Sequence, residues 1–201
     1  MLDRFVAPLI KPAVDRLAKH LASTGVRADH VTLLAFGLGT LAAVCIAMRA
    51  YWAGAALISI SRLCDALDGA VARRTAPTDA GGFLDIVLDF MFYASIPLAF
   101  ALAKPYSNAL PAAVLLAAFI GTGSSFLAFA ALAAKRNIVS IDYPHKSLYF
   151  LGGLTEATET LIFFVAMCLW PQHFASLAYL FSALCCVTIA TRIFGGWRSL
   201  Q

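Results

Sequence analysis

Residues 65–89 read DALDGAVARRTAPTDAGGFLDIVLD and contain five aspartates: Asp65, Asp68, Asp79, Asp85 and Asp89. The chain around this stretch is apolar, since 61% of its 201 residues are hydrophobic and only 13% are charged. About a quarter of the residues in a typical soluble domain are charged, and ionisable side chains are costly inside a membrane. Several carboxylates at one place in such a chain therefore indicate a functional site.

Apolar segments recur on both sides of this stretch, in keeping with a mean hydropathy of +0.82. A membrane-spanning helix needs about 20 predominantly apolar residues. We expect an all-α integral membrane protein with six transmembrane helices at about 31–48, 51–73, 81–103, 109–134, 147–170 and 174–194. Helix-breaking residues in TAPTDAGG, KPYSN and WPQ separate most of these segments.

The basic residues predict the orientation in the membrane. With the N-terminus in the cytoplasm, all but Arg49 and Lys104 of the 15 Lys and Arg residues fall on the cytoplasmic side. The positive-inside rule describes this bias, and an odd number of spans would destroy it. We therefore expect a multi-pass protein of the cell membrane, the inner membrane in a bacterium. Both termini and the aspartates then lie at the cytoplasmic face.

Residues 1–30 form a predicted segment of their own, followed by a transmembrane catalytic domain at residues 31–201. The apolar residues of this first segment follow helical spacing, and its basic residues lie mostly on the opposite side. Such a pattern is typical of an amphipathic helix that lies along the membrane surface and attracts anionic lipid. The alternative is a leader helix that packs on the bundle.

The spacing of the aspartates brings four carboxylates to one place. Asp65 and Asp68 are three residues apart, and Asp85 and Asp89 are four apart, so each pair shares one face of a helix. The two helices are antiparallel neighbours, and their pairs lie at similar depth below the turn. Oxygen ligands of this kind select hard divalent cations, and two such ions about 4 Å apart suit displacement at phosphorus. The alternative is a charge-paired hairpin, for which Arg62, Arg73 and Arg74 are available.

The residues after Asp68 favour a phosphate-bearing ligand. Gly69 leaves the backbone bare, Ala72 keeps the next turn small, and Arg73 shares a helix face with Gly69. An arginine binds phosphate through paired hydrogen bonds. We expect these residues to contact a diphosphate, although Arg73 could instead be an ordinary basic anchor at the end of the span.

The whole stretch resembles the signature of the CDP-alcohol phosphotransferases, D-x2-D-G-x2-A-R followed by G-x3-D-x3-D. Every fixed position is filled, by Asp65, Asp68, Gly69, Ala72, Arg73, Gly81, Asp85 and Asp89. The segment between the two halves is one residue shorter than the family's. This departure leaves contacts made by that loop in doubt but does not affect the metal ligands.

The resemblance implies a reaction. Family members transfer a phosphate-bearing group from a CDP-alcohol, often CDP-diacylglycerol, to an acceptor hydroxyl and release CMP. It also implies two Mg²⁺ or Mn²⁺ ions, the first bound by Asp65, Asp68 and Asp85 and the second by Asp65, Asp85 and Asp89. Asp89 would be the general base, and the CDP diphosphate would contact Gly69, Ala72 and Arg73. A homodimer is a further implication, and no nucleic-acid partner is expected.

A second, weaker resemblance lies at ADHVT, residues 28–32. Family members often have Pro-Asn-x-x-Thr there, beside the nucleotide, and only Thr32 matches well. Asp29 retains an acceptor but lacks the amide donor of asparagine, and it could equally be a helix N-cap. Thr78, in the shortened loop, is one more candidate CDP contact.

Two groups of charged residues bear on the acceptor. Lys135, Arg136 and Lys146 would suit a phosphorylated acceptor if they fold over the metal site, or they are positive-inside anchors. Glu156 and Glu159 share a helix face about three turns into the fifth span and would bind a polyol or an amino-alcohol. Alternatively, they pair with Arg62 or Arg192. The acceptor stays open between a small alcohol and a sugar phosphate.

A divalent-cation transporter with an acid-lined cytoplasmic site is the alternative function. Transport needs a route across the whole membrane, whereas the acidic residues gather at one end of the spans. The sequence therefore favours the transferase.

Overall fold

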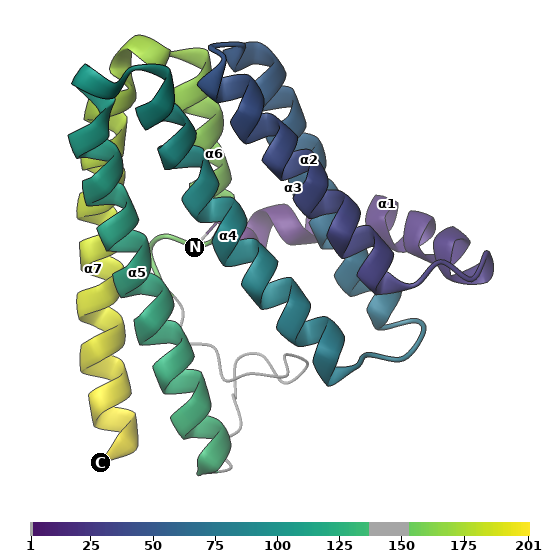
Figure 1. Ribbon diagram of the computed structural model, residues 1–201. Helices are drawn as coiled ribbons and strands as arrows, with labels where there is room; N and C mark the ends of the chain where they lie inside the picture. Colours follow the sequence, from purple (N-terminus) through teal and green to yellow (C-terminus); the bar gives the residue numbers. More distant parts are fainter. Residues whose placement is uncertain (1, 137–152) are drawn as a thin grey trace.

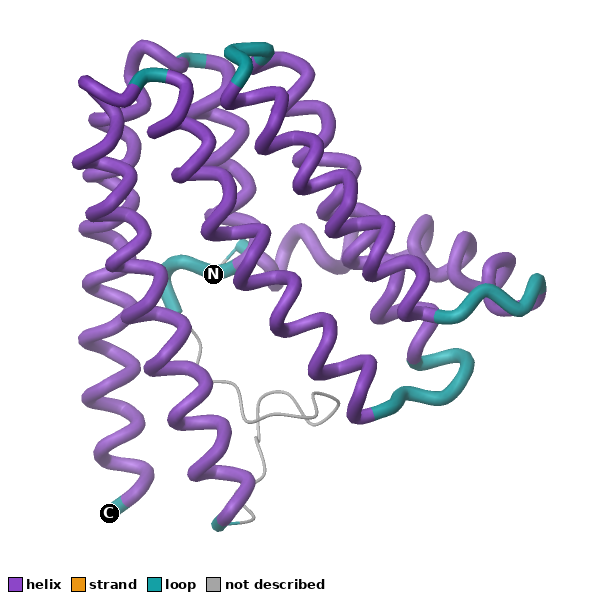
Figure 2. The backbone as a smooth tube through the Cα atoms, in the orientation of Figure 1, coloured by secondary structure: helices purple, strands orange, loops and turns teal. Residues whose placement is uncertain are grey.

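The computed structural model describes residues 2–136 and 153–201, which form seven α-helices and one short 3₁₀ helix without any β-strand. The first three helices are α1 (Asp3–Ser23), α2 (Ala28–Ala47) and α3 (Tyr51–Ala72). The next two are α4 (Asp79–Ala103) and α5 (Pro105–Lys135). The chain ends with α6 (Ala157–Leu169), the 3₁₀ helix η1 (Pro171–His173) and α7 (Phe174–Leu200). Figures 1 and 2 show α2 to α7 as a bundle, with α1 lying across it.

Within the described residues, four segments are long and apolar enough to cross a membrane: α2, α4, α5 and the segment Pro171–Leu200. The expectation of an all-α membrane protein is thereby confirmed. The count of six spans is not established, because α3 carries Arg62, Asp65 and Asp68 in its second half and α6 has only 13 residues. At 1.5 Å per residue, α6 is about 20 Å long, shorter than the ~30 Å hydrocarbon core.

The predicted fifth span is wrong in its first half, as far as the structure describes it. Residues 153–156 are not helical, and α6 begins only at Ala157. Glu156 is the N-cap of α6, and its side chain and that of Glu159 form a reciprocal capping box. Glu156 and Glu159 therefore lie at the first turn of a helix and not three turns into one.

Close helix packing positions the aspartate-bearing segments. α2 packs against both α3 and α4, and Gly39 of α2 lets the ring of Phe92 come so near that a Cβ atom there would lie 2.5 Å from it. Phe92 is 1% exposed and belongs to an aromatic core that extends to α6 and α7. In that core the rings of Phe100 and Phe174 stack with 4.5 Å between their centroids.

The first helix connects two distant parts of the bundle. Ala18 of α1 is fully buried against Val31 of α2 and the end of α3. At the start of α1, Asp3 accepts a hydrogen bond from the Thr158 amide (2.9 Å), and the Leu2 amide donates one to Glu159 (2.7 Å). The chain thus returns at α6 to the place where α1 begins, as Figure 1 shows.

Candidate active site

Three of the four signature aspartates converge between α3 and α4. One carboxylate oxygen each of Asp65, Asp68 and Asp85 lies within 4.8 Å of the others. Asp68 is only 5% exposed, and its Oδ2 atom is buried without a hydrogen-bond partner. A buried carboxylate oxygen without a partner is costly, and a cation between the three side chains would remove that cost.

This donor set fits a divalent metal ion. It offers only oxygen atoms, the ligands that Mg²⁺ and Mn²⁺ prefer. Three carboxylates so close together repel one another unless a positive charge lies between them. Asp65, Asp68 and Asp85 are therefore the residues that could hold such an ion.

Asp89, the fourth aspartate, is not part of this group and contacts an arginine. Nη1 of Arg62 lies 2.5 Å from Oδ1 of Asp89 and 3.4 Å from Oδ1 of Asp65. The charge-paired hairpin considered for this stretch is thus partly realised, through Arg62. Arg62 stands one helical turn before Asp65, an i,i+3 spacing at which opposite charges meet, so the sequence carried a signal for the contact with Asp65 but not for the one with Asp89.

Gly69 and Arg73 lie together as their spacing predicts. A Cβ atom on Gly69 would be 3.3 Å from Nη1 of Arg73, so the guanidinium folds back over the bare backbone of Gly69. Arg73 is the exposed C-cap residue of α3, and Ala72 before it is half-buried. The guanidinium of Arg73 and the open backbone of Gly69 thus lie on the same side of the C-terminal end of α3.

The residues of the weaker resemblance also come near the start of α4. Thr32 is buried in α2 beside Asp68. Oδ1 of Asp29 would lie 3.0 Å from a Cβ atom on Gly81. Asp29 is not the N-cap of α2, because Arg27 takes that position and Asp29 follows in the first turn, 2.9 Å from Nη2 of Arg27.

Thr78, a candidate CDP contact, also has a structural role. It is the N-cap of α4, and its Oγ1 atom accepts a hydrogen bond of 3.0 Å from the amide of Gly81. An N-cap satisfies one of the free amides at a helix start. Thr78 thereby fixes where the helix that carries Asp85 and Asp89 begins.

The basic residues proposed for a phosphorylated acceptor lie elsewhere or outside the described residues. Arg136 donates a hydrogen bond to the carbonyl of Leu200, which joins the ends of α5 and α7. Lys135 is exposed in the last turn of α5. Lys146 lies outside the described residues.

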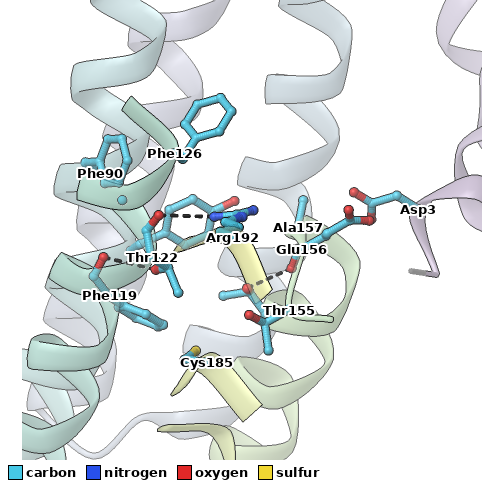
Figure 3. A pocket seen from close by; sticks show the side chains of 13 residues that line it. Asp3, Phe90, Phe119, Thr122, Phe126, Thr155, Glu156, Ala157, Cys185 and Arg192 are labelled. Carbon is cyan, nitrogen blue, oxygen red and sulfur yellow. Dashed lines mark hydrogen bonds between the residues drawn. The ribbon is translucent and has the colours of Figure 1, made fainter. Parts of the chain in front are cut away.

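A pocket of about 260 Å³ is lined in part by Phe90 and Tyr93 of α4, the helix that also carries Asp85 and Asp89. Figure 3 shows its polar side chains, among them Glu156 and Arg192, together with the aromatic walls. Nη1 of Arg192 donates a hydrogen bond of 3.1 Å to the Thr122 carbonyl. Sequence reasoning missed Arg192 as a site residue, although an arginine within an apolar helix is a functional candidate by default.

The sequence model of the CDP-alcohol phosphatidyltransferases matches residues 26–193, most of the chain. The chain belongs to the CDP-alcohol phosphatidyltransferase family. Members of this family are transferases, so the expectation of an enzyme is confirmed and the transporter alternative falls.

Two kinds of relatives resemble this family member in sequence. Inner membrane protein YnjF of Escherichia coli (strain K12) is 53% identical over 201 residues, which is 100% of this chain and 98% of the relative. Archaetidylinositol phosphate synthase of Methanothermobacter thermautotrophicus is 42% identical over 90 residues, 44% of each chain. The homology to an inner membrane protein agrees with a multi-pass membrane protein.

Solved structures of the same family share the fold. The phosphatidylinositol phosphate synthase PgsA1 of Mycobacterium tuberculosis, in complex with manganese and citrate, superposes with a TM-score of 0.72 at 21% identity. This match covers 92% of the present chain and 88% of PgsA1. A structure of PgsA1 with CDP-DAG bound gives a TM-score of 0.67 at 22% identity, over 92% of this chain and 93% of that one.

Proposed function

We propose that this CDP-alcohol phosphatidyltransferase transfers a phosphatidyl group from CDP-diacylglycerol to an acceptor hydroxyl and releases CMP. The observation that carries the proposal is the meeting of Asp65, Asp68 and Asp85 within 4.8 Å of one another at the family signature. The related PgsA1 structures, one with manganese and one with CDP-DAG, support the same metal class and donor.

In the proposed site, both the metal ion and the end of α3 contact the diphosphate of the donor. Asp65, Asp68 and Asp85 would bind Mg²⁺ or Mn²⁺, which supplies positive charge to the diphosphate of the donor when it is bound. Gly69 lets the diphosphate approach the helix backbone, and Arg73 above it offers paired hydrogen bonds to phosphate oxygens. Ala72, Thr32, Asp29 and Thr78 surround this end of α3 and α4 as further candidate CDP contacts.

The proposed chemistry needs one proton acceptor. The hydroxyl oxygen of the acceptor alcohol attacks the phosphorus atom that carries the diacylglycerol. The bond between this phosphorus and the oxygen that it shares with CMP breaks, and CMP leaves with the electron pair. Asp89 would take the proton from the attacking hydroxyl, since it lies beside the metal ligands and is 30% exposed. One of its oxygens contacts Arg62, which leaves the other for the proton.

The acceptor would occupy the pocket shown in Figure 3. The pocket begins at Phe90, directly after Asp89, and Tyr93 in its wall lies with its ring centroid 5.7 Å from the Arg62 guanidinium carbon. Asp3, Glu156 and Arg192 give it two carboxyl groups and one guanidinium group, which suit a polyol or a charged alcohol. Of the residues expected at the acceptor, Glu156 lines this pocket, whereas the other described ones, Lys135, Arg136 and Glu159, do not.

The proposed function includes an arrangement of the helices in the membrane. Residues 31–201 would form a six-helix transmembrane domain in which α3 and α6 span with the four longer helices. α1 would lie on the cytoplasmic surface, because Phe5 and Leu9 are 59% and 79% exposed on a helix that also carries Arg4, Lys11, Arg16 and Lys19. Both termini and the carboxylates would then lie at the cytoplasmic face.

The proposal is tested by measuring CMP release from CDP-diacylglycerol by the purified protein with Mg²⁺ or Mn²⁺. Candidate acceptors would be glycerol phosphate, inositol phosphate, inositol, serine and ethanolamine, with the lipid product identified in each case. We expect turnover with one class of acceptor and a loss of roughly 10²- to 10⁴-fold in Asp89→Asn, the usual contribution of a general base.

Asp79→Asn is the matched control for Asp89→Asn. Asp79 lies in the first turn of the same helix and is exposed, outside the signature. It should retain wild-type turnover. Equal turnover in Asp89→Asn and the wild type would remove Asp89 as the base, and the absence of CMP release with every acceptor would overturn the donor.

A further inference from the structure

Arg62 is packed next to the carboxylates of Asp65 and Asp89. Its side chain is 11% exposed, and its guanidinium carbon lies 3.9 Å from the ring centroid of Phe92. Nη2 donates a 3.3 Å hydrogen bond to Ser61, which is fully buried and itself bonded to the Ala35 carbonyl of α2. Because Phe92 is also buried, the positive charge of Arg62 has a fixed place in the packed core.

That place coincides with the part of the site where a second metal ion would be expected. By resemblance, the second ion is shared by Asp65, Asp85 and Asp89. In the structure, one nitrogen of Arg62 contacts the Oδ1 atoms of both Asp65 and Asp89. A guanidinium has no detectable tendency to lose its proton, so a second cation there would meet a permanent like charge at close range.

The remaining carboxylates form a set for one ion. Asp65, Asp68 and Asp85 have oxygens within 4.8 Å of one another, and Asp89 is outside this group. One divalent ion and Arg62 together bring three positive charges to four carboxylates, a near balance. In the protein without its diphosphate donor, two divalent ions with Arg62 would bring five positive charges to the four carboxylates and exceed their negative charge.

We propose that Arg62 takes the place of the second metal ion, so that the chain binds a single divalent ion at Asp65, Asp68 and Asp85. Arg62 is thus the positioning residue of Asp89: it holds one carboxylate oxygen in the way that an ion would. The inference rests on the proposed function for the metal-binding triad, and it departs from the two-ion expectation.

Metal counting tests the inference without measuring activity. The full chain, purified in detergent and stripped of metal, is dialysed against saturating Mn²⁺, and bound Mn²⁺ per chain is measured by atomic spectroscopy. We expect one Mn²⁺ in the wild type and two in Arg62→Gln, where the fixed charge is lost and Asp89 becomes available. Paramagnetic resonance should show spin coupling between neighbouring Mn²⁺ ions only in Arg62→Gln.

Three further variants isolate the role of the charge. Arg62→Lys retains the cation and should bind one Mn²⁺. The double variant Arg62→Gln/Asp89→Asn should return to one, because the carboxylate needed by the second ion is gone. Arg192→Gln, which removes another buried arginine, should also bind one. Circular dichroism confirms the helical fold of each variant before the metal is counted.

The outcomes separate the inference from the proposed function. Two Mn²⁺ ions in the wild type or in Arg62→Lys, or one in folded Arg62→Gln, would overturn the role of Arg62 and leave the metal site intact. No bound Mn²⁺ in the wild type, or unchanged binding in Asp68→Asn, would overturn the metal site of the proposed function itself.

Discussion

Asp68 links the stability of the folded protein to a bound cation. It is 5% exposed and one of its oxygens has no hydrogen-bond partner. Without a cation, the folded chain carries the cost of this buried charge beside two further carboxylates. A ligand that binds the folded state alone stabilises it in proportion to the logarithm of its concentration.

We therefore predict that Mn²⁺ stabilises the protein, by about 2.7 kcal/mol at a concentration 100-fold above its dissociation constant. Thermal unfolding in detergent micelles, with Mn²⁺ and with a chelator, measures the shift. Asp68→Asn should abolish this shift and should not lower the melting temperature of the metal-free protein, since a buried charge is removed. Asp79→Asn should retain the shift, and its loss there would show that Mn²⁺ acts elsewhere.

At the same scale, the candidate site was predictable to the extent that it depends on local spacing. The i,i+3 and i,i+4 spacings predicted that all four signature aspartates meet, and Asp65, Asp68 and Asp85 do so, whereas Asp89 lies outside the group. The role of Arg62 could not be predicted in the same way. Its contact with Asp89 spans 27 positions and depends on how α2, which packs against both α3 and α4, brings these two helices together.

Among the helices, the approach of α2 to α4 depends on one missing side chain. Gly39 lies against the buried ring of Phe92, where a Cβ atom would be 2.5 Å from Cδ2 and 3.2 Å from Oγ of Ser61. Phe92 in turn supports the guanidinium of Arg62. The metal site is thus coupled to helix packing through Gly39.

Gly39→Ala should destabilise the protein by about 1–3 kcal/mol, the usual cost of overpacking a core. Gly37→Ala, two residues earlier on the same helix, is its control, because a Cβ atom there meets nothing within 4 Å. That change should be neutral or stabilising by up to ~1 kcal/mol, since alanine favours a helix over glycine. Thermal unfolding of both variants measures the difference, and an equal effect would exclude the close packing.

Helix limits were predictable at some of the breakers but not at KPYSN, where α5 begins at Pro105 and not at the predicted 109. The predicted segment 51–73 and the observed Tyr51–Ala72 agree within one residue. The start of α6 was not predicted, because Glu156 and Glu159 were interpreted as acids inside the membrane. An acid at the cap position and Glu three residues later, before an apolar run, is also the pattern of a capping box, and this is what the structure has.

For the whole molecule, the proposed orientation places the two ends of α4 on opposite sides of the membrane. The 25 residues of this helix separate its ends by about 37 Å. Tyr106, just after its C-terminal end, is 108% exposed, and Ala76 in the loop before it is also exposed. A label at each of these two positions therefore shows which side of the membrane that end of α4 faces.

We predict that Tyr106→Cys reacts with a membrane-impermeant maleimide in intact cells, whereas Ala76→Cys reacts only after the membrane is opened. The unmodified chain, with its five free cysteines, gives the background. Labelling of Ala76→Cys in intact cells would reverse the proposed orientation. Labelling of both positions from the same side would contradict a membrane crossing by α4.

The hydrogen bonds that join Leu2 and Asp3 to α6 have a consequence for biosynthesis. Their partners are 157 and 155 residues further along the chain. At a translation rate of 5–20 residues per second, roughly 8–30 s pass between the synthesis of the two halves of this contact. The start of α1 therefore waits without its partner in α6 until the chain has been made as far as Glu159. Nascent chains that stall before that point would expose it to chaperones and proteases.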